Sequence, residues 1–378
     1  KAMSSNRQLS WPGSEGGLLS NIIEEEHEGV NTQEKIHGAM YPIQIYPLFE
    51  NALRAEKGIS IEEHNKNLAD FCAEFSNIAS ENPYAWFREK KSSREIGQIT
   101  DANRMIGFPY PKFMNSIMNV NQAAGVIVTS NEIAEKLSIP KNKWVYLHGG
   151  AEANDKWFVS DRVSYTISPA IREISKTALE MAGITLDQID FFDLYSCFPC
   201  APIIAAKSMG MDLNTLPPLT ITGGLPYFGG AGNNYSMHAI AQAVEMLRKN
   251  PNNFGYISAL GWFITKHAAG IYSGIEPQRP WDRSGFPDIQ QKIEDMDSPE
   301  ICEAPEGPAT VETYTVIHDR QGKPDNAIII ARLDDARRCW AKTKDDQELL
   351  LSMGKEEFIG KKGFVSPGNN SPNIMRFK

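Results

Sequence analysis

The chain has few cysteines and no long apolar run. Its 378 residues include five cysteines, Cys72, Cys197, Cys200, Cys302 and Cys339. A sparse, odd-numbered set excludes the disulfide framework of a small secreted domain. No apolar run approaches the roughly 18 residues of a membrane-spanning helix, and the opening residues KAMSSNRQLSWPGSEGG lack the apolar centre of a signal peptide. We therefore expect a cytoplasmic protein with no membrane partner.

Basic residues are also in the minority. The chain has 38 Lys and Arg against 47 Asp and Glu, a formal charge of −9. This balance argues against a nucleic-acid duplex or an anionic membrane surface as partner. The length and the 41% apolar content are sufficient for two or three domains with buried cores. Because the chain opens without Met in a Ser/Gly-rich stretch, we expect it to be part of a longer polypeptide.

The first part of the chain, residues 1–120, is rich in aromatic residues and proline. Within it, ISIEEHNKNLADFCAEFSNIAS places apolar residues at helical spacing, which predicts an amphipathic helix. Cys72 falls on the apolar side of this helix, so we expect it to be packed as a small apolar residue. The remainder of the region is expected to be irregular and partly helical.

From residue 121 to residue 280, predicted strands alternate with predicted helices, which indicates an α/β layer structure. AAGVIVTS is predicted to be a buried strand, and Ser130 the N-cap of a helix after it. SPAIREISKTALEMAG is predicted to be a helix that starts at Pro169 and ends at Gly183. The other predicted elements are the strands NKWVYLHGG, IDFFDLY, LTIT, FGYISALGW and HAAGIYSG and the helix YSMHAIAQAVEMLRKN.

A Pro-rich linker, residues 281–308, is expected to lead into a β-rich domain, residues 309–378. TVETYTVIHDRQGKPDNAIIIARL is predicted to be two strands joined by a polar turn. Two further predicted strands, RRCWAKT and KKGFVSP, and a short helix, QELLLSM, complete a small barrel-like unit.

Cys197 and Cys200 stand at C-x-x-C spacing in DLYSCFPCAP, at a predicted strand-to-helix turn. A redox pair would need a thioredoxin-type strand and helix before it, and a zinc site would need two more ligands. The sequence supplies neither, so we interpret the pair as buried structural cysteines and predict no metal site.

The stretch ISKTALEMAGITLDQIDFFDLYSCFPCAP resembles the thiolase superfamily. The resemblance continues in order through NVNQAAGVIVTS, ITGGLPYFGGAGNNYSMHAIAQAVEML and GYISALGWFITKHAAGIYSG. YPLFENALRA, NPYAWF, RMIGFPYPK and TKHA are similar to the branch of sterol-carrier-protein-type thiolases and acetyl-CoA acetyltransferase-like proteins. The resemblance implies the layered αβαβα thiolase fold, largely its C-terminal half, with a C-terminal domain similar to an oligonucleotide-binding fold.

Thiolase chemistry needs a cysteine nucleophile, a histidine that activates it, a second acid/base and an oxyanion hole. The resemblance places the family's catalytic histidine at Gly230, its last catalytic cysteine near Ala259 and Leu260, and its third-motif Asn or His at Tyr195. Three reactive groups are therefore missing from their usual positions, and no cysteine of the chain stands in the context of the nucleophile.

Seven residues are candidates for a site. Tyr195, His267 and His238 are the candidate catalytic residues, and Gly229, Gly230, Asn233 and Asn234 are the candidate ligand-binding residues. The glycines match no phosphate-loop spacing and would instead let a thioester or pantetheine approach the backbone. Structural alternatives exist for the others: His238 as a core histidine, His267 at a strand end, and the two asparagines as N-caps.

The resemblance implies a thiolase-like acyl-CoA-binding protein, a diverged acyltransferase in lipid metabolism. One alternative is a retro-aldol lyase in which Tyr195 is the acid/base, and another is a noncatalytic acyl-CoA or lipid carrier. Whether the chain is an enzyme stays open at this point. A coenzyme A thioester is the expected substrate or ligand, no permanently bound cofactor is expected, and the chain is expected to be a monomer or a homodimer. The C-terminal domain is expected to dock on the site or shield it.

Overall fold

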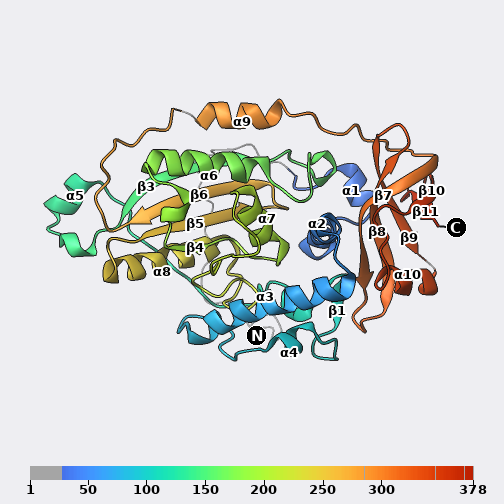
Figure 1. The fold of residues 1–378 in the computed structure, drawn as a ribbon, viewed down its shortest axis with the longest axis horizontal. Coiled ribbons are helices and arrows are strands. Elements are labelled where there is room, and N and C mark those ends of the chain that lie inside the picture. The colour runs from blue at the N-terminus through green and yellow to red at the C-terminus, as the bar shows by residue number, and fades with distance from the viewer. Residues whose placement is uncertain (1–27, 285, 345, 370, 378) are drawn as a thin grey trace, which may run out of the picture.

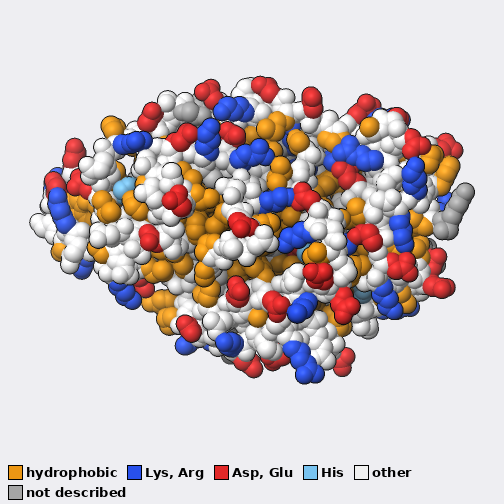
Figure 2. All heavy atoms as spheres, viewed as in Figure 1, with side chains coloured by type: hydrophobic (Ala, Val, Ile, Leu, Met, Phe, Trp, Pro, Cys, Tyr) orange, Lys and Arg blue, Asp and Glu red, His pale blue; other side chains and the backbone are white. Residues whose placement is uncertain are grey.

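The computed structural model describes residues 28–378 except 285, 345, 370 and 378. An α/β unit and a β-barrel lie side by side, and the barrel occupies the right of the view in Figure 1. Figure 2 shows apolar side chains gathered near the middle of this face and charged side chains mostly around it.

The N-terminal region is mainly helical. It consists of α1 (Thr32–Ile36), α2 (Pro42–Lys57), α3 (Ile61–Glu81), α4 (Ser93–Gly97), β1 (Met105–Gly107) and β2 (Tyr110–Pro111). α3 is the predicted amphipathic helix: the Ser60 side chain caps it by accepting from the Glu63 N–H, and Cys72 is buried on its inner side. Both predictions are therefore confirmed.

A four-stranded sheet forms the centre of the α/β unit. Its strands are β3 (Tyr146–Asn154), β4 (Phe191–Asp193), β5 (Phe254–Gly261) and β6 (Lys266–Ser273), in the order β3-β6-β5-β4. β6 is antiparallel to β3 and to β5, whereas β4 is parallel to β5. β3, β4 and β5 therefore all end at the same edge of the sheet.

Helices cover both faces of this sheet. The helices of this part are α5 (Asn131–Lys136), α6 (Pro169–Ala182), α7 (Cys200–Ser208) and α8 (Tyr235–Lys249). Tyr256 on β5 bonds Ser175 of α6, and the next residue, Ile257, packs against α8. Since successive strand residues face opposite sides, α6 and α8 lie on opposite faces. Ser130 caps α5 and α6 ends at Gly183, as the sequence predicts.

Two predicted strands in this region are wrong. AAGVIVTS forms no strand, and Ile127 and Val128 are 91% and 89% exposed. Its β-branched residues favour a strand, but no strand lies beside it in the part of the chain that the structure describes, so its backbone has no ladder to join. LTIT is also irregular: Leu219 accepts from the Leu194 N–H, but the next residues curve around the Asp193 carboxylate.

The C-terminal region is the predicted barrel. It consists of β7 (Gly307–His318), β8 (Pro324–Leu333), β9 (Arg338–Lys344), α10 (Gln347–Met353), β10 (Lys362–Ser366) and β11 (Ile374–Arg376). The order β10-β11-β9-β8-β7 closes because β10 also pairs with β7. β1 pairs with β7, so the N-terminal region is joined to the barrel by a sheet contact.

Helix α9 (Phe286–Glu294) lies between the two units in sequence and packs on α6 and β3 (Figure 1). The predicted boundaries at residues 120, 280 and 308 stay predictions. None of the helices within residues 28–378, apart from the four undescribed positions, is long and apolar enough to cross a membrane.

Candidate functional site

A small cavity lies where the sheet meets α6 and α7. Two of the predicted catalytic residues, Tyr195 and His267, both line it. Its other lining residues are mostly apolar and include Ile171, Leu194, Ala201, Met209, Tyr256 and Leu260. Its volume of about 10 Å³ is close to that of one water molecule's site. The sequence reasoning thus brought together two residues that the fold places on one cavity.

Tyr195 stands just beyond the end of β4. Its N–H donates to Ser258 Oγ at 2.9 Å, and its ring meets the Tyr235 ring edge-on at 5.3 Å. Burial raises the pKa of Tyr195 above its ordinary value, and the nearby Cys197 adds to this effect. The phenol is therefore protonated at neutral pH and suited to donate a hydrogen bond.

His267 lies near the start of β6, opposite Leu260 of β5, and is 5% exposed. Its Nε2 lies 3.3 Å from Asp155 Oδ2, and it has no other partner for that atom. The two atoms are at ion-pair distance but poorly aligned for a hydrogen bond. An imidazole whose Nε2 carries a proton toward a carboxylate has Nδ1 as its proton acceptor.

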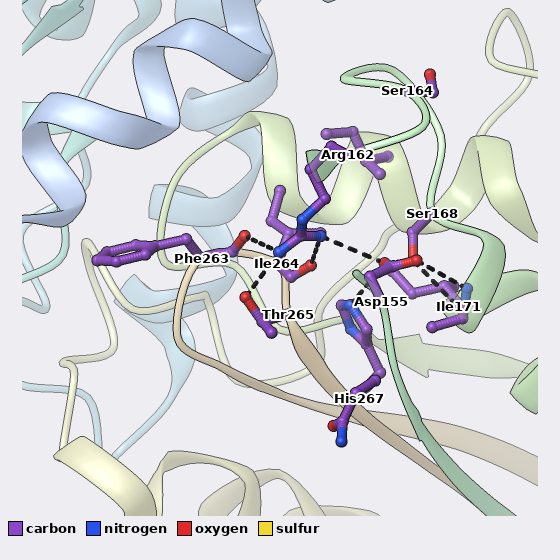
Figure 3. Close-up of polar contacts among 12 residues, drawn as sticks. Asp155, Arg162, Ser164, Ser168, Ile171, Phe263, Ile264, Thr265 and His267 are labelled. Atoms are coloured by element: carbon purple, nitrogen blue, oxygen red, sulfur yellow. Dashed lines mark hydrogen bonds and ion pairs between the residues drawn. The ribbon is translucent and has the colours of Figure 1, made fainter. Parts of the chain in front are cut away.

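Asp155 follows the last residue of β3 and is the centre of a buried polar cluster (Figure 3). It accepts from the Ser168 hydroxyl and from the Ala170 N–H, and Arg162 Nη1 lies 3.5 Å away. Burial raises the pKa of Asp155, but His267, Arg162 and Ser168 together outweigh burial and hold it below its ordinary value. Asp155 is therefore an anion that faces the imidazole.

Arg162 holds the hairpin between β5 and β6. Its guanidinium donates to the carbonyls of Ile264 and Phe263 and to Thr265 Oγ1, the last at 2.7 Å. Trp262 and Ile264 have φ values of 53° and 56°, a region that a β-branched residue rarely adopts. Such backbone strain persists only where surrounding contacts fix it, and it is concentrated at functional sites. The hairpin leads directly into His267.

The sequence analysis missed Asp155, Arg162 and Ser168. They match no motif, and they are scattered over a loop that the pattern predicts only as a connection. The available signal was positional: Asp155 comes directly after a strand, at the carboxyl edge where ligand sites of α/β sheets are found.

The remaining polar candidates lie elsewhere. His238 is buried on α8 against Phe228, at a ring separation of 5.2 Å, and burial lowers its pKa. Asn234 stands at the N-cap position of α8, but its side-chain amide binds the N–H and the carbonyl of Ala124 instead of the first turn of the helix. Asn233 is exposed in the turn before α8.

Gly229 and Gly230 are buried beneath residues 117–122. A Cβ at Gly229, whose φ is 121°, would lie 2.3 Å from Gln122 Oε1. Gly230 donates its N–H to the Ile117 carbonyl. The chain itself needs these glycines for close packing, and thioester binding by this segment stays a prediction.

Four of the five cysteines are poor nucleophiles. Burial raises the pKa of Cys72, Cys197 and Cys339 to about 12, and it raises the pKa of Cys200 as well. Cys200 donates its thiol to the Tyr46 carbonyl. The C-x-x-C thiols are thus packed and protonated. Because the reactive species is the thiolate, they are poor nucleophiles. Throughout the described ranges, no three His, Cys, Asp or Glu side chains are grouped to hold a metal ion.

A second, larger hollow lies on the opposite face of the sheet, beside α8. This groove has a volume of about 240 Å³, and its lining includes Leu147, Ile240, Ala269, Tyr272, Trp281 and Arg283. Ser258, Ala259 and Ala268 line both the groove and the Tyr195 cavity. The same stretch of β5 and β6 therefore separates the two spaces.

The sheet covered on both faces, the strand-end site and the closed barrel define a thiolase-like α/β protein with an added β domain. Residues 288–370 match the family model of the thiolase-like protein type 1 additional C-terminal domain. A monomeric SCP2-thiolase-like protein type 1 from Mycobacterium smegmatis is 36% identical, with a TM-score of 0.84 over 93% of this chain and 76% of that one. The chain belongs to the SCP2-thiolase-like proteins of the thiolase superfamily, which confirms the predicted family and fold.

A more distant likeness extends to the Ltp2–ChsH2 (DUF35) aldolase. It is 16% identical, with a TM-score of 0.50 over 62% of this chain and 64% of that one, so this likeness concerns the fold alone. No curated protein shows significant similarity to the chain.

Proposed function

We propose that the chain binds acyl-CoA thioesters and cleaves a carbon–carbon bond in them by a retro-aldol reaction. The observation that carries this proposal is the shared cavity of Tyr195, a protonated phenol, and His267, an imidazole beside the Asp155 anion. An acyl transfer through a cysteine would need a thiolate, and burial keeps four of the chain's five thiols protonated.

In this reaction His267 accepts the proton of the β-hydroxyl group as the bond between Cα and Cβ breaks. The carbonyl compound leaves, and the electron pair of the broken bond forms the enolate of the shortened acyl-CoA. The Tyr195 hydroxyl donates a hydrogen bond to the enolate oxygen, and the proton held by His267 returns to Cα. A donor aimed at developing charge in a dry site is among the strongest catalytic contributions, and a buried phenol fits that role.

The proposal is tested by incubating the protein with a panel of β-hydroxyacyl-CoA thioesters and detecting carbonyl products and shortened acyl-CoA by mass spectrometry. Tyr195→Phe removes the donor to the enolate oxygen and is expected to lower turnover by roughly 100-fold to 1,000-fold. Tyr84→Phe, at an exposed position that lines neither the cavity nor the groove, is the control and should retain turnover. Equal turnover in wild type and Tyr195→Phe would refute the role of the phenol.

A noncatalytic acyl-CoA carrier is the second candidate, and the largely apolar groove of about 240 Å³ beside α8 favours it. A carrier would bind acyl-CoA without forming product over hours. Calorimetry on Ile240→Trp, which fills the groove, separates the two: binding is lost if the groove holds the ligand and is kept if it does not. The relative's description as monomeric leads us to propose a monomer, which light scattering tests.

A further inference from the structure

Arg338, the first residue of β9, lies where the barrel meets the α/β unit. Arg338 is 0% exposed although it carries a permanent charge. Its Nε and Nη2 bind the two carboxylate oxygens of Glu312 on β7, at 2.8 Å and 2.7 Å. Its guanidinium also lies over the Tyr165 ring of the α/β unit, at 4.8 Å. A buried arginine with these partners is fixed in position.

The remaining nitrogen of Arg338 reaches out of the barrel. Nη1 donates to the carbonyl of Ser160 at 2.5 Å and to the carbonyl of Arg162 at 2.9 Å. Both carbonyls belong to the short helical turn η4 (Val159–Asp161) and the residue after it. Trp340, also on β9, donates to Ser160 Oγ at 2.9 Å. Two barrel residues therefore hold the backbone that carries Arg162.

From Arg162, the contacts continue to the site. Its side chain holds the strained β5–β6 hairpin and lies beside Asp155, and Asp155 faces His267 (Figure 3). A series of polar contacts, buried from Arg338 onward, thus runs from Glu312 of the barrel to the imidazole in the cavity.

We propose that the C-terminal barrel completes the catalytic site, with Arg338 as a positioning residue that fixes Arg162 and, through Asp155, the orientation of His267. The part of this inference that concerns turnover rests on the proposed function. The part that concerns the geometry of His267 does not.

The barrel supplies its own control. Arg332 on β8 pairs directly opposite Arg338 and binds the same Glu312 oxygens, at 2.9 Å and 3.0 Å. Its remaining nitrogen donates to Ala336 within the barrel. Arg332→Gln therefore weakens the same ion pair without touching the α/β unit.

The test is NMR at one fixed pH of ¹⁵N-histidine-labelled wild type, Arg338→Lys, Arg338→Gln and Arg332→Gln, with His267→Ala used to assign the signals. The ¹⁵N chemical shifts of the two ring nitrogens report on the tautomer and the hydrogen bonds of the imidazole. Loss of the Arg338 contacts lets Arg162 and Asp155 move, so the His267 ring ¹⁵N shifts are expected to change in both Arg338 variants. They should stay at the wild-type values in Arg332→Gln.

Turnover of a β-hydroxyacyl-CoA provides the second readout. For the Arg338 variants we expect kcat to fall at least about 10-fold with KM unchanged, since a misplaced acid/base affects the reacting state more than binding. Unchanged His267 ring ¹⁵N shifts in folded Arg338→Lys would overturn the inference, and this variant decides if Arg338→Gln does not fold. Changed ring shifts in the Arg338 variants with no turnover in any protein, wild type included, would support the positioning role and reject the proposed function.

Discussion

Two buried carboxylates lie at the same edge of the central sheet, but their partners differ in charge. Asp155 follows β3 and Asp193 ends β4, the two outermost strands. Both are almost fully buried, at 5% and 0% exposure. Asp155 has a cationic partner, Arg162, and faces the His267 imidazole, whereas Asp193 has only neutral donors.

The partners of Asp193 are arranged as a closed shell. One of its oxygens accepts from the Thr220 and Thr222 hydroxyls and from the N–H groups of Ile221 and Thr222, and the other accepts from Tyr235. Burial dominates and raises the pKa of Asp193, although these hydrogen bonds oppose it. The Asp193 carboxylate thus fixes the loop whose N–H and hydroxyl groups surround it. The Asp155 carboxylate instead faces a guanidinium and an imidazole. Equal burial therefore does not imply an equal role.

The largest expected effect is on the free energy of unfolding of Asp155→Ala. Removing the carboxylate leaves the Arg162 cation buried without its counter-ion, which costs about 3–5 kcal/mol. Urea denaturation at pH 7 measures this loss. A loss below about 1 kcal/mol would mean that Arg162 is held by the hairpin carbonyls alone.

A smaller effect, about 1.4 kcal/mol for each unit by which a pKa is shifted, separates the two carboxylates by sign. The pKa of Asp155 is lowered on folding, so its stabilisation is present above the unfolded pKa and lost as pH falls. The pKa of Asp193 is raised, so its contribution is full below the unfolded pKa and lost as pH rises through the folded value.

Urea denaturation of Asp155→Asn and Asp193→Asn at several pH values between about 2 and 7 tests this difference, because the Asp155 contribution is lost only below its unfolded pKa. Relative to wild type, the deficit of Asp155→Asn should shrink toward low pH, and the deficit of Asp193→Asn should grow toward low pH. Parallel pH profiles would remove the distinction drawn between the two sites.

The smallest expected effect is that of Tyr235→Phe. The Tyr235 hydroxyl bonds Thr222 Oγ1 at 2.7 Å and Asp193 Oδ1 at 3.2 Å. Because Asp193 retains its other donors, the loss should be about 0.5–1.5 kcal/mol. Thermal unfolding measures it, with Tyr256→Phe as control, since Tyr256 bonds Ser175 on the other face. A loss of several kcal/mol would show that the other hydrogen bonds of Asp193 are lost together with that of Tyr235.

Much of the fold follows from local pattern. The sequence predicts α3 and α8 from the spacing of their apolar residues, α6 also from Pro169 and Gly183 at its ends, and the barrel strands from short apolar runs between turns. AAGVIVTS and LTIT were mistaken for strands because β-propensity describes a side chain's fit to a sheet, while a strand also requires a partner. That partner is set by residues distant in sequence.

The site was predictable only in part. The resemblance pointed to Tyr195, and TKHA pointed to His267, and the fold brings both to one cavity. Asp155, Arg162 and Arg338 carry no motif, because their roles depend on contacts with residues that lie 112, 102 and 26 positions away, His267, Ile264 and Glu312.

The sequence by itself determined the superfamily, the α/β and barrel units, the cysteines as packed residues and the two cavity residues, because these depend on local composition and on motif order. Which charged side chains come into contact was decided by the tertiary structure alone. Burial of an ion is tolerated only where its partners converge from several elements, and here those partners come from β3, the β5–β6 hairpin and the barrel.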